Sequence, residues 1–377
     1  MRIAFYAPLK PPDHPVPSGD RRMARLLADA LRHAGHEVDL ASRLRSWTGT
    51  PDPARQARMA QVGARLGDRL LRRYRARPPE ARPRAWLTYH LYYKAPDWIG
   101  PQVSAALGIP YLLAEASVAN KRANGPWALG HKATLAALDH ARAVITLNPA
   151  DLEGLPDPGR ATLLKPFLDP APYRAAAGRR VELRARLAGD HGLDPARPWL
   201  LAVAMMRAGD KLDSYRVLAR ALGTLGDLDW HLLVAGDGPA RPEVEAAFAP
   251  LAGGRVHFLG ARDADGLAQV YAACDLLAWP ALNEAYGMAL LEAQAAGLPV
   301  VAGRGGGVAG VVRDGDTGLL TAPGDADAFG AALRRLLTDE DRRHALAAAA
   351  PRAVAAEHGL EQAAARLDAI LRAAVRP

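Results

Sequence analysis

A regular alternation of short apolar runs with longer segments of helical period is the feature that most constrains the fold. Helical patterns occupy segments such as 19–34, 55–75, 98–107, 127–140, 213–223 and 286–296. The apolar runs between them lie at 3–7, 38–41, 85–89, 111–114 and 143–147, and then at 199–204, 230–235, 256–259, 276–279 and 299–302. Apolar strands alternating with helices are typical of parallel sheets covered on both faces. The sequence therefore predicts an α/β protein with two doubly wound, Rossmann-like domains.

The two series meet in the segment 165–180, which contains three prolines and no sustained apolar period. We therefore expect a first domain at 1–170 and a second at 171–357. The chain then ends in helices, and a C-terminal helix at about 358–377 is able to pack back on the first domain. Ligands of open parallel sheets bind beyond the carboxyl ends of the strands. We expect the two sheets to face an interdomain cleft, with the chemistry in strand-to-helix loops.

The cysteine content and the hydropathy pattern limit the classes of protein that fit. Cys274 is the one cysteine among 377 residues, which excludes an internal disulfide framework and any multi-cysteine metal site and suits a reducing compartment. A membrane span needs about 18 apolar residues, and the longest candidate, 199–206, falls well short. We expect a cytoplasmic protein, with a peripheral position at the inner face of the membrane left open.

The positive charge is concentrated in the first half of the chain. The chain has a net charge of +8. Residues 1–172 contain 25 lysines and arginines and 15 aspartates and glutamates, whereas the rest of the chain contains 23 lysines and arginines and 25 aspartates and glutamates. Ten arginines lie in the basic segment 55–84, where apolar residues are spaced as in an amphipathic helix. This segment is either an ordinary solvated helix or a surface for an anionic membrane or a phosphorylated acceptor. Nucleic acid is not expected as a partner, because Tyr74 is the only aromatic residue there and no recognition motif surrounds it.

The loop and helix at 282–297 (LNEAYGMALLEAQAAG) follow a predicted strand and carry the strongest chemical pattern. Gly287 lies near the start of an Ala/Leu-rich helix, and the free amides at a helix start favour anions such as phosphate. Glu284 and Glu292 flank this start, and carboxylates accept well from paired sugar hydroxyls. The pair could hold a sugar and a ribose on either side of a diphosphate; otherwise Glu284 is a loop acid and Glu292 a solvated helix residue.

Residues 283–302 (NEAYGMALLEAQAAGLPVVA) resemble the signature of the retaining, nucleotide-sugar-dependent glycosyltransferases of family 4, which have the two-Rossmann-domain GT-B fold. Five further segments agree in the expected order, at 18–38, 202–222, 232–245, 256–280 and 314–333. The resemblance covers the second half strongly and the first half more loosely. It implies a first domain that binds the acceptor and a second domain that binds the nucleotide-sugar donor.

The resemblance also assigns residues to the donor site. Glu284 corresponds to the acid that contacts the donor sugar, and Glu292 to the acid that contacts the nucleotide ribose. The backbone amides of Tyr286, Gly287 and Met288 would then cradle the diphosphate.

Two more groups of residues in the second half are expected on the donor side. Arg207 and Lys211 correspond to the family's cationic pair, which can neutralise charge on the departing nucleoside diphosphate; otherwise they are ordinary surface cations. Gly236 and Gly238 end a predicted strand and are expected either to line the nucleotide pocket or to form an ordinary turn.

The acceptor side is assigned less closely. Gly19 and Asp20 open the first helix, and the resemblance places this loop against the diphosphate and over the acceptor. His90 ends a predicted strand. It is a candidate acceptor-binding residue or proton relay, or else a structural histidine. Glu115, where many relatives have a histidine, is a candidate base or acceptor contact. Gly310 stands where relatives usually carry a glutamate, so one donor contact is lost or supplied by another residue.

The resemblance implies a hexosyltransferase that moves a sugar from a nucleoside diphosphate to an acceptor hydroxyl with retention of anomeric configuration, in glycan or glycoconjugate biosynthesis. Its partners would be a nucleotide sugar and a glycan, lipid or small-molecule acceptor, and no cofactor or metal is expected. A front-face route, in which the departing phosphate helps to deprotonate the acceptor, needs no protein nucleophile, and none is assigned.

Several different functions fit parts of the sequence. Gly305, Gly307 and Gly310 match the dinucleotide pattern G-x-G-x-x-G of oxidoreductases, but too few residues follow for the required helix. The D-x-D pattern of metal-dependent transferases occurs at 263–265 and 325–327, where helix capping is the simpler explanation. A sugar-nucleotide epimerase, a phosphorylase of the same fold and a non-catalytic nucleotide-sugar-binding protein would each be compatible with a nucleotide-sugar site.

Overall fold

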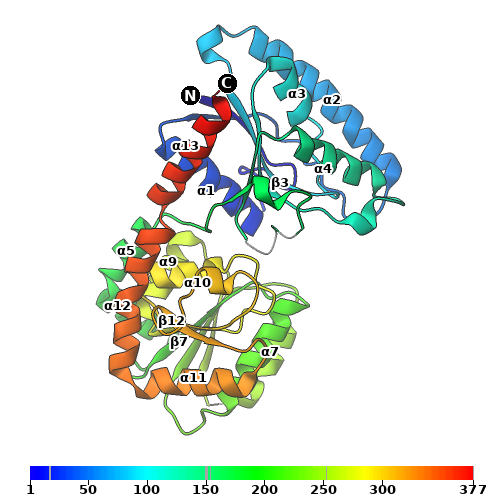
Figure 1. The fold of residues 1–377 in the computed structure, drawn as a ribbon. Coiled ribbons are helices and arrows are strands. Elements are labelled where there is room, and N and C mark those ends of the chain that lie inside the picture. Colours follow the sequence, from blue (N-terminus) through cyan, green and yellow to red (C-terminus); the bar gives the residue numbers. More distant parts are fainter. Residues whose placement is uncertain (17, 149–151, 153, 252, 377) are drawn as a thin grey trace. The chain divides into compact units, whose positions relative to one another are not determined.

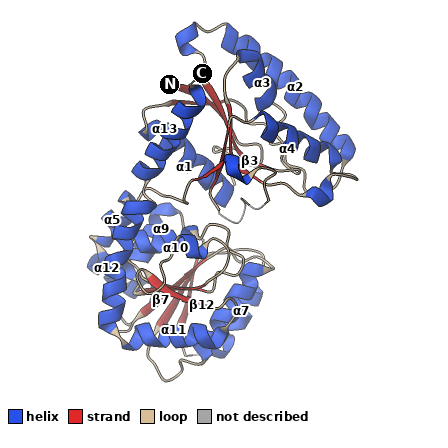
Figure 2. Ribbon diagram, in the orientation of Figure 1, coloured by secondary structure: helices blue, strands red, loops and turns tan. Residues whose placement is uncertain are grey.

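The computed structural model describes residues 1–377 except 17, 149–151, 153, 252 and 377. The chain divides into two compact units, Met1–Lys165 together with Leu360–Pro377, and Pro166–Gly359. Each unit contains a six-stranded sheet in which all strand pairs are parallel, flanked by helices (Figures 1 and 2). The chain therefore passes from one unit to the other twice, and the division falls at 165/166 where the sequence suggested 170/171.

The sheet of the first unit has the strand order β2-β1-β3-β4-β5-β6. Its strands are β1 (Arg2–Tyr6), β2 (Glu37–Leu40), β3 (Ala85–Leu91), β4 (Tyr111–Ala116), β5 (Ala143–Thr146) and β6 (Ala161–Leu163). The helices are α1 (Gly19–His33), α2 (Pro53–Arg75), α3 (Gly100–Leu107), α4 (Ala128–His140) and α13 (Leu360–Val375). The C-terminal helix α13 packs against α1, and His36 lies 2.9 Å from Asp368 of α13.

The second unit has the strand order β12-β11-β10-β7-β8-β9. Its strands are β7 (Trp199–Val203), β8 (His231–Ala235), β9 (Val256–Gly260), β10 (Leu276–Trp279), β11 (Val300–Gly303) and β12 (Gly318–Thr321). Its helices are α5 (Ala171–Ala177), α6 (Arg180–His191), α7 (Asp210–Gly223), α8 (Arg241–Phe248), α9 (Ala264–Ala273), α10 (Met288–Ala295), α11 (Ala326–Thr338) and α12 (Glu340–Glu357). The central strands are fully buried, which explains their continuous apolar runs.

The predicted α/β architecture of two parallel sheets is confirmed, and two strands were missed. Strands β6 and β12 lie at the edges of their sheets and are three and four residues long, too short for a clear apolar run. The proline-containing segment 165–180 also holds the helix α5, whose Tyr173 is buried. In the part of the chain that the structure describes, no helix combines the length and the apolar content that crossing a bilayer requires.

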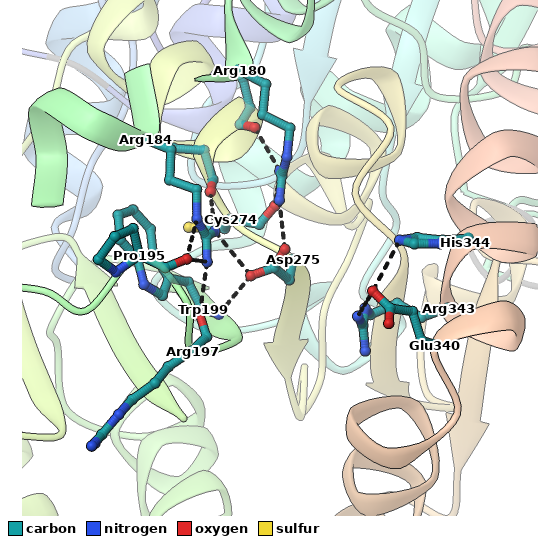
Figure 3. Close-up of polar contacts among 12 residues, drawn as sticks. Arg180, Arg184, Pro195, Arg197, Trp199, Cys274, Asp275, Glu340, Arg343 and His344 are labelled. Carbon is teal, nitrogen blue, oxygen red and sulfur yellow. Dashed lines mark hydrogen bonds and ion pairs between the residues drawn. The ribbon is translucent and has the colours of Figure 1, made fainter. Parts of the chain in front are cut away.

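A carboxylate at the amino ends of two central strands fixes helix α6 to the second sheet (Figure 3). Asp275, which precedes β10, accepts from the guanidinium groups of Arg180 and Arg184, one turn apart on α6. The same carboxylate accepts from the backbone amide of Trp199, at the start of β7, over 2.7 Å. The Arg184 guanidinium also stacks 4.1 Å from the Trp199 ring centroid. This ionic anchor holds β7, β10 and α6 together at the edge opposite the loops at the carboxyl ends.

Candidate active site

Two of the predicted donor-site residues are in contact at the carboxyl edge of the second sheet. Lys211 lies in the first turn of α7, after β7, and Glu284 lies in the loop after the neighbouring strand β10. The Lys211 Nζ forms an ion pair with Glu284 Oε2, and their side chains are only 17% and 21% exposed. The ammonium also lies 5.5 Å from the ring centroid of Trp279, the last residue of β10. The fold thus joins a cation and a carboxylate 73 positions apart in the sequence.

The loop that carries Glu284 is held to the start of α7 by two more hydrogen bonds. The Leu282 amide donates to Ser214 Oγ over 3.1 Å, and Asn283 Nδ2 donates to Asp210 Oδ1 over 2.9 Å. Ala281 and Asn283 have φ of 56° and 49°, in the left-handed region that non-glycine residues rarely adopt. Such conformations persist where the surroundings fix them and concentrate at functional sites. The sequence does not reveal the roles of Asn283, Asp210 and Ser214, because their contacts join segments far apart in the chain.

The glycine run at 305–307, which follows β11, packs directly on the backbone beside Glu284. A Cβ on Gly306, whose φ is 52°, would lie 2.2 Å from the Glu284 carbonyl oxygen, and a Cβ on Gly307 would lie 2.1 Å from that of Ala285. The Gly307 amide donates to the Glu284 carbonyl over 2.8 Å. A three-residue 3-10 turn, Val308–Gly310, follows, whereas a dinucleotide fingerprint opens a full helix. Close backbone packing therefore accounts for Gly306 and Gly307, whereas a Cβ on Gly305 would make an ordinary contact with Pro323 and one on Gly310 would meet nothing within 4 Å.

The start of α10 has the geometry of an anion site. Gly287 precedes the helix with a φ of 66°, and a Cβ there would lie 3.0 Å from Val311 Cγ2. The first helical hydrogen bond of α10 runs from the Leu291 amide to the Gly287 carbonyl. The amides of Met288 and the next two residues therefore have no acceptor within the helix. With the positive end of the helix dipole, they favour a phosphate group.

Of the other two charged donor-site candidates, one is buried and one is exposed. Glu292 lies within α10 and is only 3% exposed, so it is not a solvated helix residue. Arg207 lies in the loop between β7 and α7 with an exposed side chain, while its carbonyl accepts from the Leu212 amide over 3.2 Å.

Gly236 and Gly238, at the end of β8, are required by the contact of two loops. A Cβ on Gly236 would lie 1.9 Å from the Ala204 carbonyl oxygen, and one on Gly238 would lie 2.2 Å from that of Met206. Their φ values are 150° and 153°. The Met206 amide donates to the Asp237 carbonyl over 2.9 Å, which closes the contact. The loops after β7 and β8 therefore pack backbone to backbone.

In the first unit, the structure brings His90 and Asp20 together. His90 Nδ1 lies 2.9 Å from Asp20 Oδ1, and His90, near the end of β3, has a φ of 60°. Asp20 is in the first turn of α1, where Ser18 Oγ caps the helix by accepting from the Arg21 amide. Burial alone would raise the pKa of Asp20, but the hydrogen bond and the charge of His90 hold that pKa below its ordinary value. A Cβ on Gly19 would meet nothing within 4 Å, so the fold of this unit does not itself require that glycine.

Glu115 has a structural partner that the sequence did not suggest. Its side chain is 5% exposed, and Oε1 accepts from the Leu147 amide just beyond β5. Its φ of 61° turns the chain at the end of β4. The carboxylate therefore ties the carboxyl ends of β4 and β5 together, a role distinct from the base or acceptor contact considered from the sequence.

The two D-x-D segments cap helices. Asp263 accepts from the Gly266 amide over 2.8 Å at the start of α9, and Asp325 accepts from the Ala328 amide over 2.9 Å at the start of α11. The capping interpretation is confirmed. Among the residues that the structure describes, no group of three or more histidines, cysteines, aspartates or glutamates is placed to hold a metal ion.

Comparison with known proteins shows a family match for the segment that carries this site. Residues 197–339 match the family model described as glycosyl transferases group 1. The chain carries a domain of the group 1 glycosyltransferase family. This domain lies within the second unit and contains Lys211 and Glu284, and the family resemblance inferred from the sequence is confirmed.

Curated relatives of this glycosyltransferase domain include the D-inositol 3-phosphate glycosyltransferase of Rhodococcus jostii, 37% identical over 206 residues, which are 52% of this chain and 44% of that protein. The Mycolicibacterium gilvum protein of the same name is 38% identical over 183 residues, 47% of this chain and 39% of that protein. The chain thus spans less than half the length of these relatives.

Solved structures show that the whole chain has the GT-B fold. A glycosyltransferase from Rickettsia africae superposes with a TM-score of 0.76 at 17% identity, covering 100% of this chain and 98% of that one. Anabaena HepE in complex with UDP-glucose superposes with a TM-score of 0.71 at 18% identity, covering 99% and 100%. Sucrose-phosphate synthase from Thermosynechococcus elongatus gives a TM-score of 0.71 at 22% identity, covering 99% and 98%.

Proposed function

We propose that this protein is a retaining glycosyltransferase that moves a sugar from a nucleoside diphosphate to an acceptor hydroxyl. The observation that carries the proposal is the contact of Lys211 with Glu284 beside the free amides at the start of α10. A carboxylate for sugar hydroxyls, a cation and an anion-binding helix start then lie at one edge of one sheet. The match of residues 197–339 to the group 1 glycosyltransferases supports the same reaction.

In this proposal each group acts on a different part of the donor. Glu284 accepts hydrogen bonds from donor sugar hydroxyls, and Glu292 contacts the ribose. The amides at 286–288 bind the diphosphate, and Lys211 with Arg207 neutralises the charge that grows on it as the glycosidic bond breaks. The leaving phosphate oxygen takes the proton of the acceptor hydroxyl on the same face, so the configuration is retained without a protein nucleophile.

The remaining assignments belong to the same proposal. Gly236 and Gly238 allow the loop after β8 to pack closely on the loop after β7, and the nucleotide binds over these two loops. By the family resemblance, Gly19 is assigned to the donor and Asp20 to the acceptor, and His90, 2.9 Å from Asp20, contacts the acceptor. Glu115 stabilises the acceptor side of the first unit through the hydrogen bond that it accepts from the Leu147 amide.

The first test is donor binding and product analysis. HepE was solved with UDP-glucose, so UDP-glucose is the first donor to try, within a thermal-shift screen of nucleotides and nucleotide sugars. Glycan, lipid and small-molecule acceptors are then offered, and the anomeric configuration of the product is read by NMR. A retained configuration supports transfer, whereas an altered sugar nucleotide or a sugar phosphate product would indicate an epimerase or a phosphorylase. Activity lost with chelator and restored by manganese would contradict the metal-independent mechanism.

The assignment of Glu284 to the donor site can be tested with one variant. Glu284→Ala should lower turnover strongly while the protein stays folded. The matched control is Glu245→Ala on α8, which removes an exposed pair with Arg241. Donor hydrolysis by wild type that disappears in Glu284→Ala also excludes a non-catalytic binding role. Transfer by Glu284→Ala at the wild-type rate would show that the donor site lies elsewhere.

We also propose a peripheral contact of α2 with an anionic membrane at its inner face. Helix α2 exposes seven arginines, and its buried residues, such as Leu70 and Tyr74, face the protein. The contact is therefore electrostatic, at about 1 kcal/mol per arginine near the surface, and sensitive to salt. Co-sedimentation with phosphatidylglycerol vesicles, but not phosphatidylcholine vesicles, is the expected result. Equal recovery with both lipids would identify α2 as an ordinary solvated helix.

A further inference from the structure

Four aromatic side chains form a continuous strip on the first unit, at the carboxyl end of its sheet. This aromatic strip consists of Trp47 after β2, Tyr92 and Tyr93 after β3, and Trp127 directly before α4. Trp47 Nε1 donates to the Tyr92 hydroxyl over 3.2 Å, and the rings of Tyr92 and Tyr93 have centroids 5.6 Å apart. The Tyr93 and Trp127 centroids are 5.3 Å apart.

The loops that carry the strip are fixed to one another. The Thr48 amide donates to the Lys94 carbonyl over 2.8 Å, which joins the loops after β2 and β3. The start of α4 packs on Tyr93, since a Cβ on Gly130 would lie 2.2 Å from the Tyr93 carbonyl oxygen. The strip continues to His90, whose ring centroid is 5.5 Å from that of Tyr92. Trp127 is buried and lies behind Tyr93, whereas Trp47, Tyr92 and Tyr93 are partly exposed. These three rings therefore form a preformed surface that begins at the proposed acceptor contact.

Three cations lie against the rings of the strip. The Arg45 guanidinium is 4.6 Å from the Trp47 centroid, and the Arg122 guanidinium is 5.6 Å from the Tyr93 centroid. The Lys94 ammonium lies between Tyr93 and Trp127, at 5.8 and 5.6 Å from their centroids. Cation–π contacts hold a cation in place while leaving its hydrogen-bond donors available.

The charge of these cations is not neutralised nearby. No carboxylate of the described residues forms an ion pair with Arg45, Lys94 or Arg122. The buried Nε of Arg122 has no hydrogen-bond partner within the described part of the chain. The neighbouring acids are already engaged: Asp20 pairs with His90, and Asp97 is buried and accepts from Thr88, Tyr111 and the amides of Ile99 and Gly100. The cations of the strip are therefore available to an anion from outside the chain.

We propose that the aromatic strip binds an anionic group of the acceptor, a phosphate or a carboxylate carried on a polar ring, through Lys94 and Arg122. Arginine suits such oxyanions because its guanidinium donates in a planar fork, and hydrogen bonds between ions are the stronger ones. The ring of the acceptor would pass along Tyr92 toward His90, which places its hydroxyl at the proposed acceptor contact. This inference rests on the proposed glycosyl transfer and narrows its acceptor to an anionic class.

The test measures binding of free probes to the full-length protein by titration calorimetry. Glucose 6-phosphate and glucuronate are compared with neutral glucose, and the better of the two anions distinguishes phosphate from carboxylate. The double variant Lys94→Met/Arg122→Met removes the charges and keeps apolar stems on the rings. The matched control, Lys132→Met/Arg142→Met, removes one exposed lysine and one exposed arginine from the same unit. Circular dichroism and melting temperature show that both variants fold.

We expect at least one anionic probe to bind wild type and the control equally and more tightly than glucose, and the double variant to lose about tenfold or more in affinity. Equal affinity for glucose and the anions, binding of neither anion, or an unaffected double variant would overturn the proposal. The melting shift with UDP-glucose reports the donor site independently. If that shift and transfer are present while anion selectivity is absent, only this inference fails; if the donor shift is absent as well, the proposed function fails.

Discussion

Replacing Gly307 by alanine should displace the loop that carries Glu284. The new Cβ would lie 2.1 Å from the Ala285 carbonyl oxygen, and contacts of this kind stay above 3.0 Å, so one backbone segment must move by about 1 Å. The cost of such overpacking is about 1–3 kcal/mol. For a unit of this size, that cost corresponds to a melting temperature lower by roughly 2–12 °C. Because the Gly307 amide also bonds the Glu284 carbonyl, the shift reaches the Lys211–Glu284 pair.

Gly310→Ala is the matched control, three residues along the same turn. A Cβ on Gly310 meets nothing within 4 Å, so the free energy of unfolding of this variant should equal that of wild type or exceed it by up to about 1 kcal/mol. Scanning calorimetry of both variants measures the stability, and UDP-glucose binding and transfer measure the site. We expect Gly307→Ala to lose both stability and transfer. If Gly307→Ala melts and transfers as wild type does, the close packing of the glycine run on the Glu284 loop is not what holds that loop.

Three further expectations concern ion pairs of the second unit. Lys211→Met should lower kcat by about 10²–10³-fold, as for loss of one group that stabilises transition-state charge; steady-state kinetics with an unchanged kcat would contradict this role. The hydrogen bonds from Arg334 lower the pKa of Asp227 to about 2, so this pair stabilises the fold above the unfolded pKa near 3.8, and its contribution is lost as the pH falls through the folded pKa. The melting temperatures of wild type and Asp227→Asn should therefore differ at neutral pH and converge toward pH 2, and a difference that persists there would refute the assignment. Asp275→Asn leaves two arginines without their shared carboxylate and should cost about 2–3 kcal/mol, less than for a fully buried pair because Arg180 is 41% exposed; chemical denaturation without a shift would count against the anchor.

The apolar runs were sufficient to predict the architecture because buried parallel strands have a clear one-dimensional pattern. All ten predicted strands are present, and β7, for example, covers Trp199–Val203 where 199–204 was expected. The edge strands β6 and β12 escaped because each has one partner strand and few residues. The helix α5 escaped for a different reason, since two prolines near its start concealed seven helical residues.

The candidate site was predictable only where a single segment carries the pattern. Glu284 was found through the resemblance of residues 283–302, and its contact with Lys211 follows from the adjacency of β7 and β10. The supporting bond of Asn283 to Asp210 depends on how two loops fold against each other, which no local pattern encodes. The same holds for Glu115, whose partner Leu147 lies 32 positions away. Gly305, Gly307 and Gly310 matched a cofactor motif, but close backbone packing requires only Gly307 of the three.

The position of α13 has a consequence for the order in which the protein is made. Residues 1–165 leave the ribosome first, but the helix that covers α1 comes from 360–375, after every strand of the second unit has been synthesised. Domains generally fold as they emerge, N-terminal first. Helix α1 therefore stays uncovered until the second unit has been synthesised, and translation that stops between residue 359 and the end of α13 leaves the first unit incomplete although every residue of the second unit is present.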